Sequence, residues 1–241
     1  MELCFKGKVV LVTGATRGIG NRIANDLLNA GAHVIATGTN DMSLKLLSSD
    51  FEKICVDFLD KNSTNNFLKK IEKKKIDICI NNAGINSIAN ISEINLVNWD
   101  DIINVNLTVP FKILKAICKN MKNKKYGRVV NIASIWGVVG KEKRAAYSSS
   151  KFGIVGLTVS TAAELAKYNI LVNSVSPGFT LTDLTKRILS QTEMDKIVKT
   201  IPIGRMAKPR DISSVVLFMC SDLNSYISGQ NIVVDGGFTS V

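Results

Sequence analysis

Histidine is nearly absent from this sequence, in which His33 is the only one. A single histidine excludes both a histidine-based metal cluster and a Ser-His-Asp catalytic triad, so we expect no bound metal. No two of the five cysteines are close enough in sequence to form a CxxC motif. Cys55 and Cys79 lie within apolar, strand-like runs, which predicts buried, reduced thiols in a reducing compartment.

Long apolar runs are missing as well. No stretch of about 18 apolar residues occurs, so no membrane-spanning helix and no membrane contact are expected. An apolar strand begins at Lys8 and a glycine-rich turn follows it, which is not the pattern of a signal peptide, and we expect a cytoplasmic protein. Proline is scarce, and no linker, repeat or low-complexity segment divides the chain. The sequence therefore predicts one domain, residues 1–241.

Positive charge is the main excess, with 31 basic against 20 acidic residues and a formal net charge of +11. Two clusters of cations fall where a predicted helix ends before a strand, so they are either solvated helix ends or a docking surface for an acidic partner. Aromatic residues are not interleaved with them, and we expect no nucleic acid partner. The clusters are Lys69, Lys70, Lys73, Lys74 and Lys75, and Lys119, Lys122, Lys124, Lys125 and Arg128.

Short β-branched runs alternate with longer helical stretches along the chain. Several runs are apolar on both faces, as in a parallel sheet covered by helices. The pattern predicts an α/β fold with a doubly wound, Rossmann-type parallel sheet of about seven strands and helices on both faces. The predicted strands are Val9–Thr13, His33–Thr37, Lys53–Val56, Ile76–Ile80, Arg128–Ala133, Ile170–Val175 and Asn231–Val234. The predicted helices are Gly18–Ala30, Asn62–Lys73, Trp99–Met121, Tyr147–Lys167 and Pro209–Ser221.

A glycine-rich turn, Thr13-Gly14-Ala15-Thr16-Arg17-Gly18-Ile19-Gly20, joins the first predicted strand to the first helix. Glycines let the backbone approach a pyrophosphate, and the free N–H groups of the helix start favour an anion. The spacing departs from the G-x-G-x-x-G fingerprint, and a tight turn without a ligand is the alternative.

The end of the second strand predicts which dinucleotide binds there. An acidic residue for the ribose 2′-hydroxyl is expected about 20 residues after the glycines. The segment Thr37–Asn40 holds no carboxylate, and Asp41 is predicted to cap a short helix. Arg17 could pair with a 2′-phosphate, so the sequence favours NADP(H) over NAD(H).

Polar residues at strand ends and on one helix form a candidate catalytic set. Tyr147 and Lys151 share a helix face, where the lysine is expected to lower the tyrosine pKa and make it a general acid. Such a pair alone is typical of a helix surface. Ser134, however, ends a strand at the edge where ligands bind in open α/β sheets, and its hydroxyl could hold a substrate carbonyl. Asn81-Asn82-Ala83-Gly84 ends the preceding strand, and Asn106 lies inside a helix that it does not favour.

With these motifs in this order, the chain resembles the short-chain dehydrogenase/reductase family from about Lys6 to Gly237. The resemblance implies that Tyr147 is the acid/base and that Lys151 lowers its pKa and contacts the nicotinamide ribose. It also implies that Ser134 orients the carbonyl and that Asn106 supports a proton-relay water. The implied cofactor contacts are Thr13, Gly14, Arg17, Gly18, Ile19, Gly20, Thr37, Asp57, Asn82, Ala83, Gly84, Tyr147, Lys151, Pro177, Gly178 and Thr182.

Within this family the nearest resemblance is to the 3-oxoacyl-[acyl-carrier-protein] reductases. It implies a homotetramer and an acidic carrier protein as partner, which Lys125 and Arg128 could help to dock. The charged loop Lys141–Arg144 departs from those reductases and resembles sugar, polyol and other alcohol dehydrogenases of the same family. A non-catalytic cofactor-binding regulator is a third alternative, disfavoured by the intact catalytic set. The stretch 179–209 is predicted to be a substrate lid.

Overall fold

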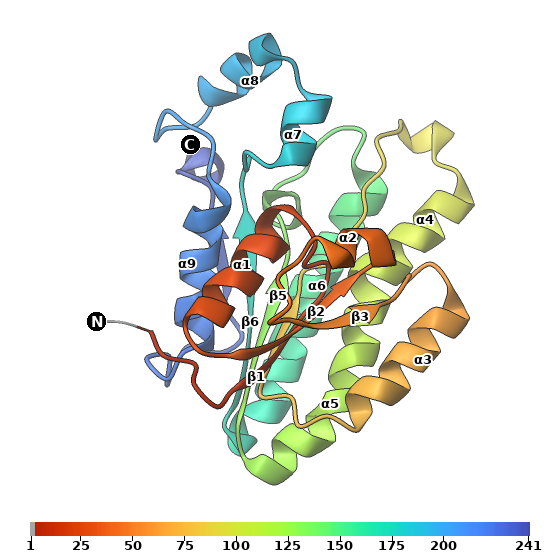
Figure 1. The fold of residues 1–241 in the computed structure, drawn as a ribbon. Helices are drawn as coiled ribbons and strands as arrows, with labels where there is room; N and C mark the ends of the chain where they lie inside the picture. Colours follow the sequence, from red (N-terminus) through yellow and green to blue (C-terminus); the bar gives the residue numbers. More distant parts are fainter. Residues whose placement is uncertain (1–2) are drawn as a thin grey trace.

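One parallel sheet runs through the molecule (Figure 1). The computed structural model describes residues 3–241. Within them, seven strands pair in the order β3-β2-β1-β4-β5-β6-β7, which reverses direction between β1 and β4. The doubly wound prediction is therefore confirmed, and its switch point lies where ligands bind in such sheets. The strands are β1 (Val9–Val12), β2 (His33–Gly38), β3 (Glu52–Cys55), β4 (Ile78–Asn81), β5 (Gly127–Ile132), β6 (Ile170–Pro177) and β7 (Asn231–Val234).

Helices cover both faces of the sheet and create two apolar cores. Val10 and Val12 of β1 join Ile23 of α1 in one core, whereas Leu11 joins Ile113 of α5 in the other, as strand alternation requires. Within residues 3–241, no helix is long and apolar enough to cross a membrane. The helices are α1 (Gly18–Asn29), α2 (Asp41–Lys45), α3 (Lys61–Glu72), α4 (Leu96–Ile103), α5 (Val109–Lys124), α6 (Ala145–Leu165), α7 (Asp183–Ile188), α8 (Gln191–Val198) and α9 (Pro209–Cys220).

The helix predicted over Trp99–Met121 has an irregular turn inside it. A π-helical turn, Asn104–Thr108, lies between α4 and α5. Pro110 lies two residues after this turn and has no N–H to donate to the carbonyl of Asn106, so the regular hydrogen-bond ladder is broken there. Such turns occur frequently at functional sites. The break therefore draws attention to Asn106.

Two local predictions from the sequence are wrong. Asn40, not Asp41, caps α2, because its side chain accepts a hydrogen bond of 2.8 Å from the N–H of Ser43. Cys55 is exposed rather than buried, because it ends β3, the edge strand of the sheet. Cys79, in the central strand β4, is buried as predicted.

The segment between β6 and α9 rises beyond the sheet at the top of Figure 1. It carries α7 and α8, and its two ends are joined by a parallel bridge between Thr180 and Ala207. The N–H of Leu181 also donates to the carbonyl of Ala207 over 2.8 Å. This segment is the stretch predicted as a lid, and it stands above the carboxyl ends of the strands.

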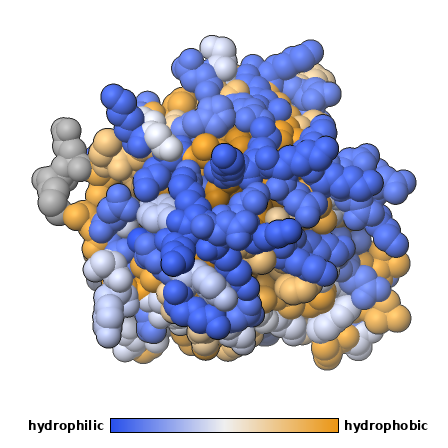
Figure 2. Space-filling model, turned by 90° about the horizontal axis from the view of Figure 1, so that it is seen from below, coloured by the Kyte–Doolittle hydropathy of each residue, from blue (hydrophilic) through white to orange (hydrophobic). Residues whose placement is uncertain are grey.

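The lysine clusters lie at the opposite edge, where α3 and α5 end. Figure 2 views the molecule from that side and shows a mostly hydrophilic face. Lys74 pairs with Glu52 over 2.6 Å, and Lys122 pairs with Glu164 over 2.9 Å. These contacts fit the interpretation of the clusters as helix ends.

Arg128 does not belong to an exposed patch. Its side chain is buried, and its Nη1 donates to the carbonyls of Gly127 (2.9 Å) and Asn169 (3.0 Å). Its guanidinium also lies over the ring of Tyr126. The expectation that Arg128 helps to dock an acidic partner is therefore wrong, whereas Lys125 is exposed.

Candidate active site

Two loops meet at the switch point of the sheet, one after β1 and one after β4. The side-chain amide of Asn82 donates to the carbonyls of Thr13 (2.9 Å) and Gly14 (3.0 Å). In return, the hydroxyl of Thr13 accepts from the N–H groups of Asn82 (2.9 Å) and Ala83 (3.0 Å). Thr13 is buried, so these bonds fix the two loops against each other from inside.

Steric constraints explain why glycine occupies three positions of the turn. Gly14 and Gly18 have φ values of +64° and +57°, which other residues rarely adopt. A Cβ on Gly20 would lie only 2.4 Å from the carbonyl oxygen of Gly14. The chain thus keeps a bare backbone where α1 begins, and the N–H groups of Gly18, Ile19 and Gly20 form the start of that helix.

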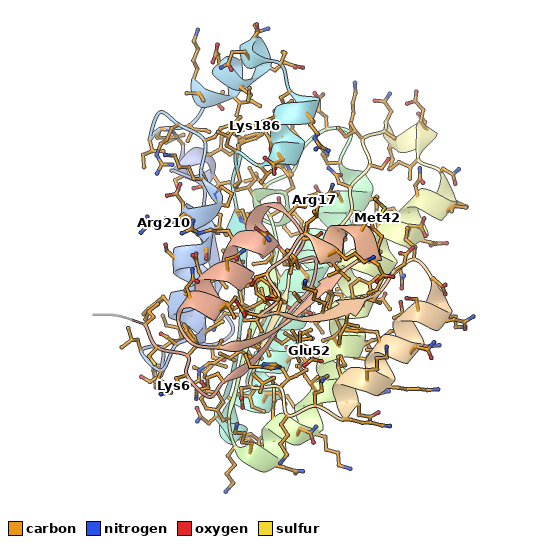
Figure 3. All side chains as sticks on the ribbon, viewed as in Figure 1. Lys6, Arg17, Met42, Glu52, Lys186 and Arg210 are labelled. Carbon is orange, nitrogen blue, oxygen red and sulfur yellow. The ribbon has the colours of Figure 1, made fainter. Side chains whose placement is uncertain are left out.

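Arg17 stands at the rim of this turn as the residue before α1. It is exposed, and within residues 3–241 its guanidinium makes neither an ion pair nor a hydrogen bond. Figure 3 shows it between Met42 of α2 and Lys186 of α7. A cation in this position remains available for an anionic ligand.

Thr37 has a different role from the one expected. Its side chain is 1% exposed, and its hydroxyl accepts from the N–H of Gly14 over 3.2 Å. Its carbonyl accepts from the N–H of Ala15 over 2.8 Å. Almost no surface of Thr37 is left for a ligand, so it supports the glycine turn from inside the protein. The prediction that Thr37 contacts the cofactor directly is therefore wrong.

Asp57 lies two residues beyond the end of β3, at the same edge of the sheet. It is exposed, and its carboxylate accepts from the N–H of Leu59 over 2.9 Å. One carboxylate oxygen is thus used locally, and the other can reach a ligand. The position agrees with the predicted adenine contact, which stays a prediction.

Lys151 is the most unusual cation of the site. It is 4% exposed, and its Nζ donates to the carbonyl of Ile132 over 2.7 Å. No carboxylate pairs with it among residues 3–241, and burial lowers its pKa to about 8. A Cβ on Gly84 would lie 3.7 Å from this Nζ and 3.3 Å from Asn106 Oδ1, so the three residues close around one small space.

Tyr147 stands one helical turn before Lys151 on α6, and Lys151 Nζ lies 5.5 Å from its ring centroid. Burial raises the pKa of Tyr147, while the nearby Ser134 hydroxyl and Arg144 guanidinium oppose the rise. The predicted lowering of this pKa by Lys151 is therefore wrong for the protein alone. The physical reason is that the ammonium group bonds to Ile132, whereas the phenol loses hydration.

Ser134 lies two residues beyond the end of β5. Its hydroxyl oxygen accepts from the N–H of Trp136 over 3.2 Å, and the side chain is 7% exposed. Since an acceptor bond leaves the hydroxyl hydrogen free, Ser134 can still donate to a substrate oxygen. Its proximity to Tyr147 brings two O–H donors to one place.

Asn106 uses its amide to hold two segments together. Its Nδ2 donates to the carbonyl of Ile85 (2.9 Å) and to Ser150 Oγ (3.0 Å), and its Oδ1 accepts from the N–H of Ile85 (2.9 Å). Both donor hydrogens are occupied, so only the second lone pair of Oδ1 can hold a relay water. Asn106 is therefore mainly a positioning residue.

Ser150 is a residue of the site that the sequence reasoning missed. It is completely buried, and its hydroxyl donates to the carbonyl of Tyr147 over 2.7 Å while accepting from Asn106. The chain of bonds from Ile85 through Asn106 and Ser150 thus reaches the backbone of Tyr147. Its place one residue before Lys151 was visible in the sequence, but Ser148 and Ser149 precede it, and only the structure shows that Ser150 is the buried one.

The segment after β6 passes beside the glycine turn. A Cβ on Gly178 would lie 2.7 Å from Asp235 Cα, so the backbone passes tightly here beside buried Pro177. Thr182 caps α7, and its methyl group would lie 3.4 Å from a Cβ on Gly18. Thr182, in the stretch predicted as a lid, therefore lies beside the glycine turn.

These residues fit a nicotinamide dinucleotide. The bare glycine backbone offers room for a pyrophosphate, and Arg17 offers a free cation near it. Tyr147, Ser134 and Lys151 gather proton donors where a carbonyl could lie. No group of three His, Cys, Asp or Glu side chains suited to a metal occurs within the described chain.

Comparison with known proteins covers almost the whole chain. A family model described as "Enoyl-(Acyl carrier protein) reductase" matches residues 14–239. The 3-oxoacyl-[acyl-carrier-protein] reductase FabG of Aquifex aeolicus is 40% identical, over 98% of this chain and 99% of that protein. Its counterpart from Escherichia coli is 37% identical over 98% and 99%.

Solved structures agree with this relationship. A putative NAD(P)-dependent gluconate 5-dehydrogenase from Beutenbergia cavernae with bound NADP matches with a TM-score of 0.91 at 33% identity, over 99% of both chains. A 4-hydroxyisoleucine dehydrogenase complexed with NADH matches with a TM-score of 0.91 at 33% identity, over 98% of this chain and 100% of that one.

Fold, site and relatives define an NAD(P)-dependent oxidoreductase that interconverts a carbonyl and an alcohol by hydride transfer. The chain belongs to the short-chain dehydrogenase/reductase family.

Proposed function

We propose that this protein reduces a 3-oxoacyl thioester carried by an acyl carrier protein, with NADPH as the reductant. The observation that carries the proposal is the convergence of Ser134, Tyr147 and Lys151 beside the glycine turn. Full-length identity of 37–40% to 3-oxoacyl-[acyl-carrier-protein] reductases supports the choice of substrate.

The proton donors have separate tasks in this proposal. When bound, the reduced nicotinamide supplies the hydride for the substrate carbonyl. Ser134 donates its free hydroxyl hydrogen to the carbonyl oxygen and orients it. Tyr147 transfers its phenolic proton to the same oxygen as negative charge develops there. Its raised pKa keeps the phenol protonated at neutral pH, which suits the direction of reduction.

Lys151 and Asn106 support this chemistry. Lys151 has three N–H donors and spends one on Ile132, so two remain for the hydroxyls of a cofactor ribose. Asn106 holds Ile85 and Ser150, and through Ser150 it fixes the backbone of Tyr147. The remaining contacts with the cofactor are assigned to Asn82, Ala83, Gly84, Pro177, Gly178 and Thr182, with Asp57 at the adenine.

We propose NADP(H) as the preferred cofactor because Arg17 is exposed and unpaired within residues 3–241. The segment Thr37–Asn40 offers no carboxylate that would repel a 2′-phosphate. Asp41 and Asp57 both lie near Cys55 at the end of β3, and the proposal assigns the 2′-phosphate to Arg17. The preference for NADP(H) over NAD(H) should therefore depend on Arg17.

We further propose that the chain is a single-domain protein that works in the cytoplasm as a homotetramer. Apolar side chains on the outer surfaces of α5 and α6 support self-association, since Phe111, Phe152 and Val159 are 48%, 48% and 51% exposed. Lys125 is exposed, but it lies at the edge of the sheet opposite the active site, so its positive charge would assist the encounter with an acidic carrier protein rather than place the acyl chain at Tyr147.

A sugar or polyol dehydrogenase is the second candidate. The loop Lys141–Arg144 precedes Tyr147 with three cations and one acid, and Arg144 is only partly exposed. The structural neighbour from Beutenbergia cavernae is described as a gluconate 5-dehydrogenase. A cation beside Tyr147 would suit a substrate with a carboxylate.

The test is a substrate and cofactor panel followed by the absorbance of the reduced cofactor. A 3-oxoacyl N-acetylcysteamine thioester and 5-ketogluconate are each offered with NADPH and with NADH. The proposal predicts that the thioester with NADPH exceeds every other combination in kcat/KM by about tenfold or more. Efficient reduction of 5-ketogluconate without reduction of the thioester would transfer the assignment to the second candidate.

A further inference from the structure

Three aromatic rings from distant parts of the chain meet beside the active site. Trp136 follows β5, Phe179 follows β6, and Phe238 lies near the carboxyl terminus. Their ring centroids are 5.3 Å apart for Phe179 and Phe238, and 6.0 Å from Trp136 to either phenylalanine. All three pairs have the edge-to-face geometry that aromatic clusters prefer.

This aromatic cluster is separate from the folding cores. None of its three rings belongs to either apolar core on the faces of the sheet. Each ring is partly exposed, so apolar surface remains open at the edge where ligands bind. Rings that served only to stabilise the fold would be expected in one of the two cores.

The cluster adjoins the catalytic residues through the backbone. The N–H of Trp136 donates to the hydroxyl of Ser134 over 3.2 Å. Phe179 directly follows Gly178, and its carbonyl accepts from the N–H of Ala207 at the base of the lid (2.9 Å). The residue that carries the Trp136 ring thus lies one hydrogen bond from the hydroxyl that would hold the substrate carbonyl.

The carboxyl-terminal segment is anchored, which makes Phe238 a fixed wall. The carboxylate of Asp235 accepts from the N–H groups of Gly237 (2.9 Å) and Thr239 (2.7 Å) and from the Thr239 hydroxyl (2.7 Å). The carbonyl of Gly236 accepts from the N–H of Ile203, on the returning part of the lid, over 3.1 Å. The segment thus links the lid to the aromatic cluster.

We propose that Trp136, Phe179 and Phe238 form a subsite for the hydrocarbon chain of the substrate, next to the reacting carbonyl. This inference rests on the proposed reduction of an acyl thioester and names what selects the acyl group. Each methylene group buried against the rings should increase the affinity for the substrate about fourfold. Hydroxyl groups would lose hydration there without a new partner, so a polyol chain is disfavoured.

The first experiment measures kcat/KM for short-, medium- and long-chain 3-oxoacyl N-acetylcysteamine thioesters. In the wild-type protein kcat/KM is expected to rise with chain length. Phe238→Ala, which does not touch Ser134, and Trp136→Ala reduce the value for the medium chain by about tenfold and for the shortest chain by less than about threefold. Tyr226→Ala removes a ring that is 96% exposed elsewhere and is the matched control, with no change expected.

A second readout does not require turnover. Trp99 and Trp136 are the two tryptophans, so Trp99→Phe leaves Trp136 as the single fluorescent reporter. With oxidised cofactor present, 3-oxoacyl thioesters cannot react, and their binding is expected to change the Trp136 emission with an affinity that grows with chain length.

The two experiments separate failure of the subsite from failure of the proposed function. Absent turnover together with chain-length-dependent binding would reject the reductase and retain the subsite. A kcat/KM profile that Phe238→Ala and Trp136→Ala leave parallel to wild type would overturn the subsite. So would a Trp136 signal that does not depend on chain length.

Discussion

Lysines at the two ends of the parallel strands differ in their surroundings. We call these ends the amino edge and the carboxyl edge of the sheet. At the amino edge, Lys124 is 53% exposed and its ammonium pairs with Asp77, a carboxylate that is 1% exposed. At the carboxyl edge, Lys151 is 4% exposed and has only the carbonyl of Ile132 and no carboxylate among residues 3–241. A paired charge stabilises the fold, whereas a buried, unpaired one is retained at a thermodynamic disadvantage and points to function.

The largest effect expected from this comparison is on turnover. Lys151→Met keeps an unbranched side chain but removes the ammonium group. We predict that kcat/KM falls by about 10²-fold or more, because the cofactor ribose and Tyr147 lose this group. The melting temperature should stay the same or rise, since a buried charge is removed. A loss of activity that merely follows a loss of folded protein would contradict the prediction.

The free energy of unfolding should depend on pH because burial lowers the pKa of Lys151. Its pKa is about 8 in the folded protein, against 10.5 for the ordinary value. Between these values the unfolded chain binds more protons, so stability rises with pH across this window. The full difference corresponds to about 3 kcal/mol. Urea unfolding of wild type and Lys151→Met at several pH values should show this rise only in the wild type, and parallel curves would refute it.

Lys124→Met tests the other edge. Among residues 3–241, the change leaves the buried carboxylate of Asp77 with the N–H of Val9 as its only partner (2.9 Å). We expect a loss of about 1–3 kcal/mol in the free energy of unfolding, less than for a fully buried pair because Lys124 is half exposed. Turnover below the unfolding temperature should be unchanged. A specific loss of activity without destabilisation would break the contrast between the two edges.

The smallest predicted effect concerns Arg144, which opposes the rise in the pKa of Tyr147. Arg144→Ala should move that pKa further upward. In the direction of alcohol oxidation, which needs the phenolate, the limb on which kcat/KM rises with pH should then shift to higher pH. Arg144→Lys keeps the charge and is the matched control. An unshifted profile in Arg144→Ala would show that the guanidinium does not influence Tyr147.

Much of the fold was predictable because its signals are local. Short β-branched runs between helical stretches predicted all seven strands to within a few residues, and β7 has its predicted bounds. The glycine turn was equally visible, since Gly14 and Gly18 need positive φ values. The π-helical turn was not foreseen, although Pro110 signals a broken ladder, because its position depends on the contacts of Asn106 with another segment.

The site was predictable in its members and less so in their roles. Asn106, Ser134, Tyr147 and Lys151 could be named from spacing and strand ends. Burial reversed the expected pKa shift of Tyr147, and burial depends on packing that spacing does not show.

Two supporting residues show the same limit. Thr37 faces the glycine turn rather than a ligand, and Ser150 is one of three consecutive serines of which only the structure identifies the inward one.

The most direct test of the account is Tyr147→Phe, assayed with the carbonyl substrate and separately titrated with NADPH. If Tyr147 is the proton donor, turnover falls by about 10³-fold while the affinity for NADPH changes little, because only one hydroxyl is lost. Turnover close to that of the wild type would contradict the central claim that the carboxyl edge of the sheet performs acid catalysis through this phenol.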